Sequence, residues 1–91
     1  SRREVQVSGV GAISLTPLEC QLLELLMLNA GHVLTHSAII DHVWGPEGAD
    51  RDMLRQVVHR LREKIEPDSS EPIYIETVPG LGYGLSIHTE P

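Results

Sequence analysis

Five of the seven basic residues of this chain lie in one short segment between positions 50 and 64: Arg51, Arg55, Arg60, Arg62 and Lys64. Only three acidic residues fall in the same segment, so its formal charge is +2, whereas the remainder of the chain carries −8. Guanidinium groups bind phosphates and can also donate two parallel hydrogen bonds to one guanine. The segment therefore has the chemistry of a nucleic-acid-binding surface, although the same charges also suit an ordinary solvent-facing helix.

The spacing of apolar residues predicts which side chains of this segment face outward. The apolar residues recur at steps of four, three and four, which is the buried face of a helix over roughly 51–66: Leu54, Val58, Leu61 and Ile65. Gln56 and Arg60 then lie one turn apart on the opposite face, with Met53 a turn earlier. We expect these three side chains to contact base edges in the major groove, where Gln pairs with adenine, Arg with guanine, and an apolar group meets the thymine methyl.

The flanks of the same helix carry four residues that we expect to contact phosphates: Arg55, His59, Arg62 and Lys64. Phosphate contacts position a protein on DNA without selecting a sequence. The alternative for two of these residues is a bond within the helix, from Arg62 to Glu66 and from His59 to Glu63. Such pairs stabilise an isolated helix by only ~0.2–0.5 kcal/mol each.

Two helices are predicted ahead of this segment. Thr16 is a candidate N-cap with Pro17 in the first helical position and Glu19 placed to complete a capping box. This first helix should end near 30–31, where Gly31 can adopt a left-handed conformation. Its predicted core side chains are mostly leucines, and Cys20 should be buried with them: Leu18, Leu22, Leu23, Leu25, Leu26, Met27 and Ala30.

The second helix should begin at Thr35 and stop at Gly45-Pro46, because the residue before a proline disfavours helical geometry. Its one-sided apolar face consists of Ile39, Ile40, Val43 and Trp44. Trp44 is better explained as a core residue than as a ligand, although its indole N–H can still bind a phosphate. The short polar connection over 46–50 requires the next helix to pack close by.

Strands are predicted at both ends of the chain. The alternation at Val5, Val7, Ile13 and Leu15, with glycines between, favours a short N-terminal hairpin. Residues 73–78 alternate as a strand, 79–82 reverse the chain, and Tyr83, Leu85 and Ile87 share one face of a returning strand. The order hairpin, three helices, hairpin predicts one α+β domain over 1–91: a winged helix-turn-helix whose C-terminal β-hairpin is the wing.

Composition excludes several other classes of protein. With Cys20 as the single cysteine, no internal disulfide or cysteine-based zinc site can form, and the five histidines lack metal-ligand spacing. No apolar run approaches the ~20 residues that a membrane span requires, and the first residues do not resemble a secretory signal. We expect a cytoplasmic protein that is not an enzyme and has no metal or cofactor. The glycines of Gly80-x-Gly82-x-Gly84 suit a hairpin better than a phosphate-binding loop, because no helix follows them.

Four sequence strings together identify a known family: Leu15-Thr16-Pro17-Leu18-Glu19, Val43-Trp44-Gly45, Leu61-Arg62-Glu63-Lys64-Ile65-Glu66 and Thr77-Val78-Pro79-Gly80-Leu81-Gly82-Tyr83. In their order and spacing they resemble the OmpR/PhoB family of response-regulator effector domains. The resemblance implies a third helix in the major groove and a wing in the adjacent minor groove. It also implies an upstream receiver domain phosphorylated through a sensor kinase, and two effector domains bound as a dimer on directly repeated half-sites of double-stranded DNA.

The resemblance also implies roles for individual residues. Base contacts correspond to Met53, Gln56 and Arg60. Phosphate contacts correspond to Trp44, Val57, His59 and Arg62. Together with the helix flanks and the wing, the full set expected to contact phosphates or to form wing contacts is Thr35, His36, Trp44, Arg55, Val57, His59, Arg62, Lys64, Thr77, Gly80 and Tyr83. The loop that relatives use to contact RNA polymerase corresponds to Gly45, Pro46, Glu47, Gly48, Ala49 and Asp50.

Four departures from the family pattern weaken the positive potential of the expected interface. His36, Asp52, Pro79 and Gly84 stand where basic residues are usual, so the predicted wing carries almost no positive charge. Together with the net charge of −6, this favours an alternative in which the winged helix is a protein–protein interaction module with weak or no DNA binding. The salt dependence of the DNA-binding constant separates the two functions. Each neutralised phosphate contributes about −0.9 to the slope of log K against log salt concentration, and we expect about three to four neutralised phosphates per domain.

Overall fold

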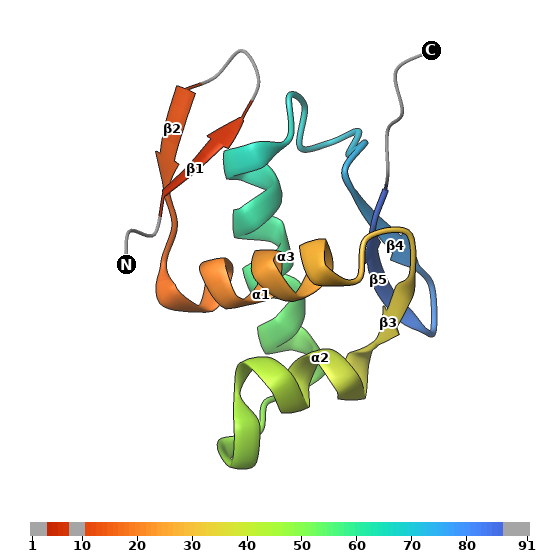
Figure 1. Ribbon diagram of the computed structural model, residues 1–91. Coiled ribbons are helices and arrows are strands. Elements are labelled where there is room, and N and C mark those ends of the chain that lie inside the picture. Colours follow the sequence, from red (N-terminus) through yellow and green to blue (C-terminus); the bar gives the residue numbers. More distant parts are fainter. Residues whose placement is uncertain (1–3, 8–10, 87–91) are drawn as a thin grey trace.

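The computed structural model describes the backbone of residues 4–7 and 11–86 and the side chains of 14–86. Three helices pack together with two small antiparallel sheets (Figure 1). The elements in chain order are β1 (Glu4–Val7), β2 (Gly11–Ser14), α1 (Pro17–Leu28), β3 (Val33–Thr35), α2 (His36–Val43), the 3₁₀ turn η1 (Gly45–Glu47), α3 (Arg51–Ile65), β4 (Ile75–Val78) and β5 (Gly82–Leu85). The α+β class and the three predicted helices are confirmed.

The N-terminal hairpin is also confirmed. β1 pairs antiparallel with β2, with Val5 opposite Ile13 and Val7 opposite Gly11. The turn predicted around Gly9 lies outside the described residues, as does Ile87 at the far end of the predicted returning strand.

The start of α1 follows the predicted capping box. Glu19 N–H donates to Thr16 Oγ1 at 3.2 Å, and Thr16 N–H donates to Glu19 Oε1 at 3.1 Å. The helix ends at Leu28, earlier than predicted, with Asn29 as its C-cap. Gly31 does have a positive φ of 87°, but its N–H donates to Leu85 O in β5 rather than to the helix. Pairing with the sheet therefore takes the chain out of the helix early.

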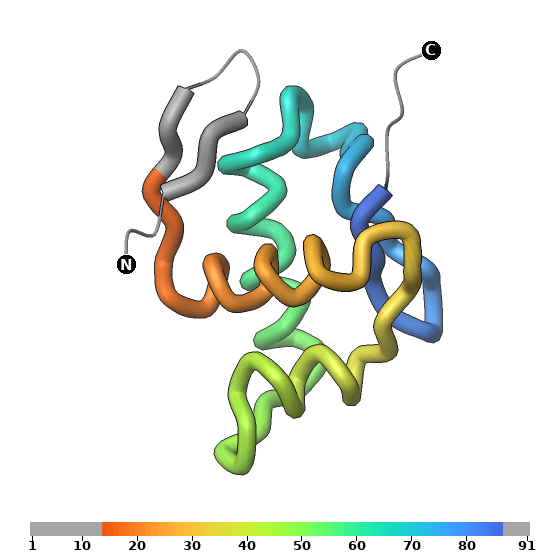
Figure 2. The backbone as a smooth tube through the Cα atoms, viewed as in Figure 1, coloured from red at the N-terminus to blue at the C-terminus, as the bar shows by residue number. Residues whose placement is uncertain are grey.

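The buried arc of α1 is narrower than the leucine pattern predicts. Leu22, Leu23 and Leu26 are buried as expected. Met27 is 58 % exposed and Ala30 is half-buried, so these two residues are corrected from the core, whereas Cys20 is half-buried rather than buried but packs against the core as expected. Helix α1 packs on α2, α3 and β5 and crosses in front of α3 in Figure 2. Met27 lies beside the buried face of α1, and Ala30 follows the end of the helix at Leu28.

Helix α3 lies at the centre of the core, behind α1 and α2 in the view of Figure 1. Its four predicted core residues are buried, and Val57 is buried with them at 4 % exposure. Side chains from every other described helix and from the C-terminal sheet complete this cluster: Leu22, Leu26, Ile39, Val43, Ile75 and Tyr83. Thr35 caps α2 as predicted, accepting a hydrogen bond from Ala38 N–H at 3.1 Å.

The C-terminal sheet has three strands rather than the predicted two. β3 pairs with β5, so the strand order is β3-β5-β4, with Leu34 opposite Tyr83 and Tyr83 opposite Thr77. The predicted hairpin is confirmed, but a three-residue strand is too short to show alternation in a sequence. The turn joining β4 to β5 has Pro79 followed by Gly80 at φ 76°, and Leu81 N–H donates to Val78 O, an arrangement typical of a type II turn.

The contact between β3 and β5 requires glycine at position 82. A Cβ placed there would lie 1.8 Å from Leu34 O, whereas at Gly84 the nearest atom, His32 O, is 3.0 Å away. Gly82→Ala should therefore separate two backbones and destabilise the domain by about 1–3 kcal/mol, since overpacking a closed site has that cost. Urea denaturation measures the effect, with Gly84→Ala as a matched control in the same strand. Equal losses for the two variants would contradict the steric argument.

Candidate nucleic-acid interface

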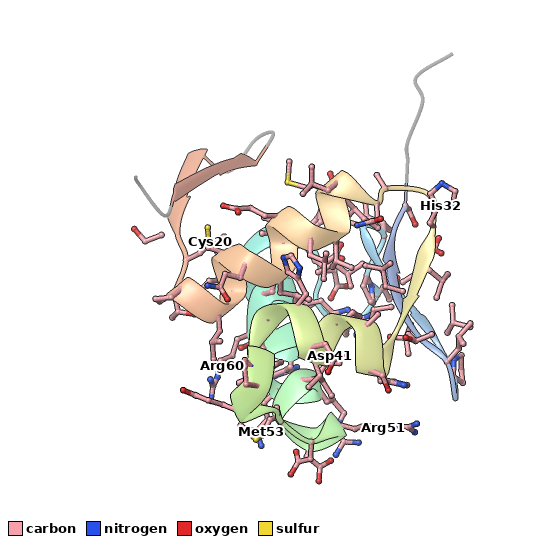
Figure 3. All side chains as sticks on the ribbon, turned by 60° about the horizontal axis from the view of Figure 1, so that its bottom comes forward. Cys20, His32, Asp41, Arg51, Met53 and Arg60 are labelled. Carbon is pink, nitrogen blue, oxygen red and sulfur yellow. The ribbon has the colours of Figure 1, made fainter. Side chains whose placement is uncertain are left out.

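The outward face of α3 gathers the three residues predicted to contact bases. Met53 is 43 % exposed, and Gln56 and Arg60 are exposed on the following two turns. Figure 3 shows Met53 and Arg60 projecting away from the packed helices. Arg55, Gln56, His59 and Arg60 line a shallow open hollow on this surface. The face is thus a continuous polar strip beside an apolar methionine.

Val57 does not belong to this face. Its side chain is 4 % exposed and packs in the core, one position beyond Gln56 and therefore about 100° further around the helix. A buried apolar side chain offers no phosphate ligand, so the phosphate contact predicted at Val57 gains no support from its side chain.

Two of the flanking residues contact acidic neighbours on the same helix. Arg55 Nη2 lies 2.5 Å from Asp52 Oδ1, and both side chains are more than two thirds exposed. His59 Nε2 lies 3.5 Å from Glu63 Oε2, as the alternative interpretation of this residue predicted. Exposed pairs of this kind contribute little to stability, so both groups can exchange their partner for a phosphate.

Arg62 is half-buried and bonds to the C-terminal sheet. Its Nη2 donates to Ile75 O at 2.8 Å and to Thr77 Oγ1 at 2.7 Å, both in β4. The predicted pair with Glu66 is wrong, because the Glu66 carboxylate is 7 % exposed and accepts the backbone N–H groups of three consecutive residues, 73–75. A buried carboxylate requires such donors, and the local helix spacing does not reveal them.

Lys64 is also engaged within the fold. Its Nζ lies 2.5 Å from Glu19 Oε1, which joins the end of α3 to the start of α1. Burial disfavours the charged form of Glu19, but hydrogen bonds from Lys64 and Thr16 together with the Lys64 charge hold the pKa of its carboxyl below the ordinary value. Lys64 therefore contributes to the packing of α3 against α1 rather than to the binding of an external ligand.

Tyr83 joins the predicted wing to the start of α2. Tyr83 in β5 is 6 % exposed, and its ring meets the His36 ring edge-on, with centroids 5.7 Å apart and an interplanar angle of 87°. Thr35, Thr77 and Gly80 are exposed, whereas Trp44 is half-buried against the core at the end of α2. The exposed three can present polar atoms to a ligand; the core explanation of Trp44 is supported.

The connection from α2 to α3 is compact. η1 occupies 45–47, and Gly45 and Gly48 have φ values of 66° and 68°, which suit glycine. Asp50 is the N-cap of α3, accepting a hydrogen bond from Met53 N–H at 2.8 Å. This loop therefore projects as a preformed turn whose last residue also fixes the start of α3.

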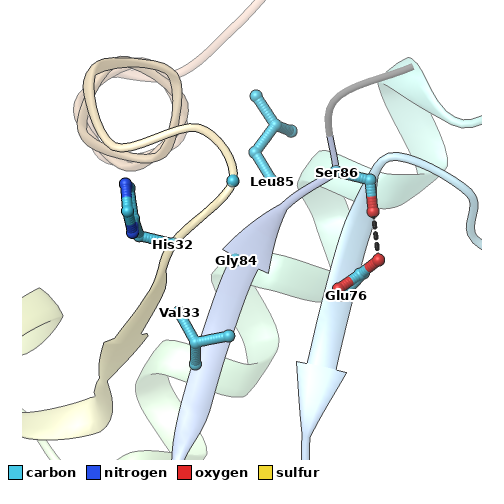
Figure 4. Close-up of a pocket in the computed structure, with 7 residues that line it drawn as sticks. His32, Val33, Glu76, Gly84, Leu85 and Ser86 are labelled. Atoms are coloured by element: carbon cyan, nitrogen blue, oxygen red, sulfur yellow. Dashed lines mark hydrogen bonds between the residues drawn. The ribbon is translucent and has the colours of Figure 1, made fainter. Parts of the chain in front are cut away.

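A second hollow lies on the C-terminal sheet, where Gly84 leaves a gap between Val33 and Glu76 (Figure 4). The Ser86 hydroxyl donates to the Glu76 carboxylate at its rim. In the described part of the chain no group of three or more His, Cys, Asp or Glu residues can hold a metal ion, and no helix there is long and apolar enough to cross a membrane.

The chain is similar to proteins of one known family. A family model described as "Transcriptional regulatory protein, C terminal" matches residues 10–85. The chain belongs to this family. The sensory transduction protein RegX3 of Mycobacterium leprae is 48 % identical over 85 residues, covering 92 % of this chain and 42 % of that protein. The KDP operon transcriptional regulatory protein KdpE of Escherichia coli is 40 % identical over 76 residues, covering 82 % and 34 %. The chain therefore spans about two fifths of the length of RegX3 and a third of KdpE.

Solved structures identify the type of response-regulator effector domain as OmpR/PhoB. DrrB of Thermotoga maritima, an OmpR/PhoB homolog, matches with a TM-score of 0.77 at 32 % identity, covering 84 % of this chain and 35 % of that chain. The DNA-binding domain of Klebsiella pneumoniae RstA, solved in complex with the RstA box, matches with a TM-score of 0.79 at 28 % identity, covering 94 % and 85 %. The resemblance stated from the four sequence strings, and the winged-helix fold class, are confirmed.

Sequence reasoning missed some residues that shape this OmpR/PhoB-type surface. Arg51 is exposed in the first turn of α3 and projects from the same end as Met53 (Figure 3). Asp50 as the helix cap could have been found, because an Asp directly before an apolar periodic run is a typical N-cap. The β4 partners of Arg62 leave no such local signal.

The pair between Lys64 and Glu19 generates a stability prediction. Lys64→Met leaves the buried Glu19 carboxylate without its main donor and should cost roughly 1–3 kcal/mol at neutral pH. Because the folded pKa of Glu19 is lowered from 4.5, the stabilisation by this pair is complete above that value and is lost as the pH falls through the lowered one. The penalty of Lys64→Met should therefore shrink toward pH 3.

Urea denaturation at pH 7 and pH 3.5 measures the loss of stability in Lys64→Met and its decrease at low pH. Arg51→Met, which removes an exposed cation at the other end of the same helix, is the matched control and should change stability by less than about 0.5 kcal/mol. A pH-independent penalty for Lys64→Met would show that the pair does not carry the effect.

Proposed function

We propose that this chain is the sequence-specific, double-stranded DNA-binding output domain of a two-component response regulator that controls transcription. In this proposal α3 enters the major groove and the hairpin of β4 and β5 acts as the wing beside the adjacent minor groove. The observation that carries it is the division of α3 into a buried apolar face and an outward strip of Met53, Gln56 and Arg60. The RstA domain, solved with its DNA box and similar over 94 % of this chain, supports the same use of the fold.

The proposed base contacts follow from side-chain chemistry. Arg60 can donate two hydrogen bonds to guanine O6 and N7, and Gln56 can pair with the N6 and N7 edge of adenine. Because the two residues are one turn apart, they reach neighbouring base pairs together. Met53 offers an apolar surface to a thymine methyl group at the start of the helix.

Phosphate contacts are proposed from polar groups on either side of this strip. Arg55 and His59 flank it on α3, and Thr35 and His36 lie at the start of α2. The indole N–H of Trp44, the wing residues Thr77 and Gly80, and the Tyr83 hydroxyl complete the proposed set. Val57 is left out because it is buried, and Lys64 because it is paired with Glu19.

The regulatory setting is proposed from the relatives, of which this chain covers less than half. An upstream receiver domain would accept a phosphoryl group through a sensor kinase and favour dimers on directly repeated half-sites. The preformed turn over 45–50 is the proposed contact with RNA polymerase, where Glu47 is exposed and Gly45 and Gly48 hold the turn.

Selection of duplexes from a random library at ~50 mM salt tests this proposal, because low salt preserves phosphate contacts. We expect one enriched motif, and its relaxation at one position in Arg60→Ala with a loss of about 1–3 kcal/mol. Arg55→Ala is the matched control, which should weaken binding to all sequences alike. Selection that returns no motif from a folded sample would overturn sequence-specific binding.

The alternative, a protein-binding module, is favoured by one structural finding. Of the five cationic residues near α3, Arg62 and Lys64 are held within the fold, and Asp52 lies 2.5 Å from Arg55. In the described part of the chain, Arg51, Arg55 and Arg60 then remain as exposed cations on α3, so the electrostatic attraction to DNA is small.

A salt titration of the binding constant separates the two functions. We expect a slope equivalent to about three phosphates, the lower end of the range expected from sequence. Pro79→Arg restores a cation at the exposed wing turn and should steepen the slope by about 0.9 while raising affinity. Pro79→Ala controls for loss of the proline ring. A flat slope in both the original chain and Pro79→Arg would favour the protein-binding module.

A further inference from the structure

We infer that Arg62 is a positioning residue that fixes the wing against the recognition helix α3, and that it does not bind a DNA phosphate. This inference rests on the proposed DNA-binding function and deepens it. It differs from the role that family resemblance implies for Arg62, which is a phosphate contact.

The hydrogen bonds of Arg62 give the first argument. Nη2 donates to Ile75 O at 2.8 Å and to Thr77 Oγ1 at 2.7 Å, at the first and third residues of β4. These acceptors lie 13 and 15 residues further along the chain, so one guanidinium nitrogen joins the fourth turn of α3 to the strand that leads into the wing turn. Ile75 is itself fully buried, which anchors that end of β4 in the core.

The Tyr83 ring and the surrounding residues also hold the guanidinium group of Arg62. Its Cζ lies 6.0 Å from the centre of the Tyr83 ring in β5, within the range of a cation–π contact. Among the described residues its Nε is buried and has no hydrogen-bond partner. Nε therefore cannot reach an external phosphate, and Nη2 is directed toward its two acceptors in β4.

Tyr83 extends the connection to α2. The edge-on contact of its ring with His36, with centroids 5.7 Å apart, joins β5 to the first residue of α2. Arg62, Tyr83 and His36 thus form a row of contacts from α3 through the wing strand to α2. Both helices of the helix-turn-helix are therefore held at a defined position relative to the wing.

The chemistry of this contact requires arginine. Lysine keeps the positive charge but is a compact point charge without a planar fork, so it cannot span both acceptors and lie against the Tyr83 ring in the same way. Arg62→Lys consequently separates the two roles. A phosphate contact tolerates lysine, whereas a positioning contact with β4 does not.

The first experiment needs no DNA. Amide hydrogen exchange and amide chemical shifts are measured on the free 91-residue chain, with Arg62→Lys compared against Arg60→Lys as an exposed control on the same helix. In Arg62→Lys we expect exchange to accelerate roughly tenfold at the amides of β4, the wing turn and β5, where 1.4 kcal/mol corresponds to a factor of ten. The amides of α1 should keep their protection, which distinguishes a local loosening of the wing from general destabilisation.

The second experiment uses random-sequence 20-bp duplexes and compares Arg62→Lys with Arg62→Met across a salt series. A positioning role predicts that both variants bind about equally weakly, several-fold below the original chain, with an unchanged salt slope. A phosphate contact predicts near-original affinity for Arg62→Lys and a slope shallower by about 0.9 for Arg62→Met, which would overturn the inference.

A second variant keeps the test decisive if Arg62 substitutions fail to fold. Thr77→Val removes one of the two acceptors and should accelerate exchange in the wing in the same direction, while Thr77→Ser retains the hydroxyl and should not. Unchanged exchange in Thr77→Val would count against the inference. If no variant binds DNA, the proposed function fails, and the exchange experiment still decides whether Arg62 fixes the wing.

Discussion

Burial of one face of α3 is the constraint on which the other elements depend. A helix turns by 100° per residue, so placing Leu54, Val57, Val58, Leu61 and Ile65 in the core fixes its rotation about its own axis. Gln56 and Arg60 have no other direction than outward once those five are buried. Helices α1 and α2 pack on the same helix, and Ile75 brings β4 into the same cluster. The element proposed to meet DNA is thus also the element around which the domain is folded.

This double use of α3 divides its charged residues between two tasks. Arg62 and Lys64, in the last turns, hold β4 and α1 to the helix, whereas Arg51, Arg55 and Arg60 remain at the surface. In a chain with a net charge of −6, committing two cations to internal contacts leaves a weakly positive interface. Non-specific attraction to phosphates is therefore small, and discrimination between sequences depends more on base contacts than on charge.

The parts of the fold that sequence predicted are those with local signals. The capping box at Thr16, the cap at Thr35 and the apolar spacing of α3 each involve residues within four positions of one another, and all three are confirmed. The errors concern contacts between distant segments. Lys64 contacts Glu19 across 45 residues of sequence. Strand β3 forms because Gly82 in β5 lets the two backbones approach, and no spacing within 33–35 reveals that contact. The spacing within α3 is likewise silent on the bonds of Arg62, because its acceptors in β4 lie outside its own helix.

The Glu66 carboxylate has a consequence for the surface loop that follows it. By accepting the N–H groups of Ile73, Tyr74 and Ile75 at 2.8–3.1 Å, it closes the chain onto itself at the two ends of segment 67–72. Residues 67–71 between these ends are exposed and lie outside the strands of the sheet, and Asp68 forms a small turn with Ser70 there. This loop is consequently the place where the chain can accept an insertion, an affinity tag or a fluorophore while the start of β4 stays in register.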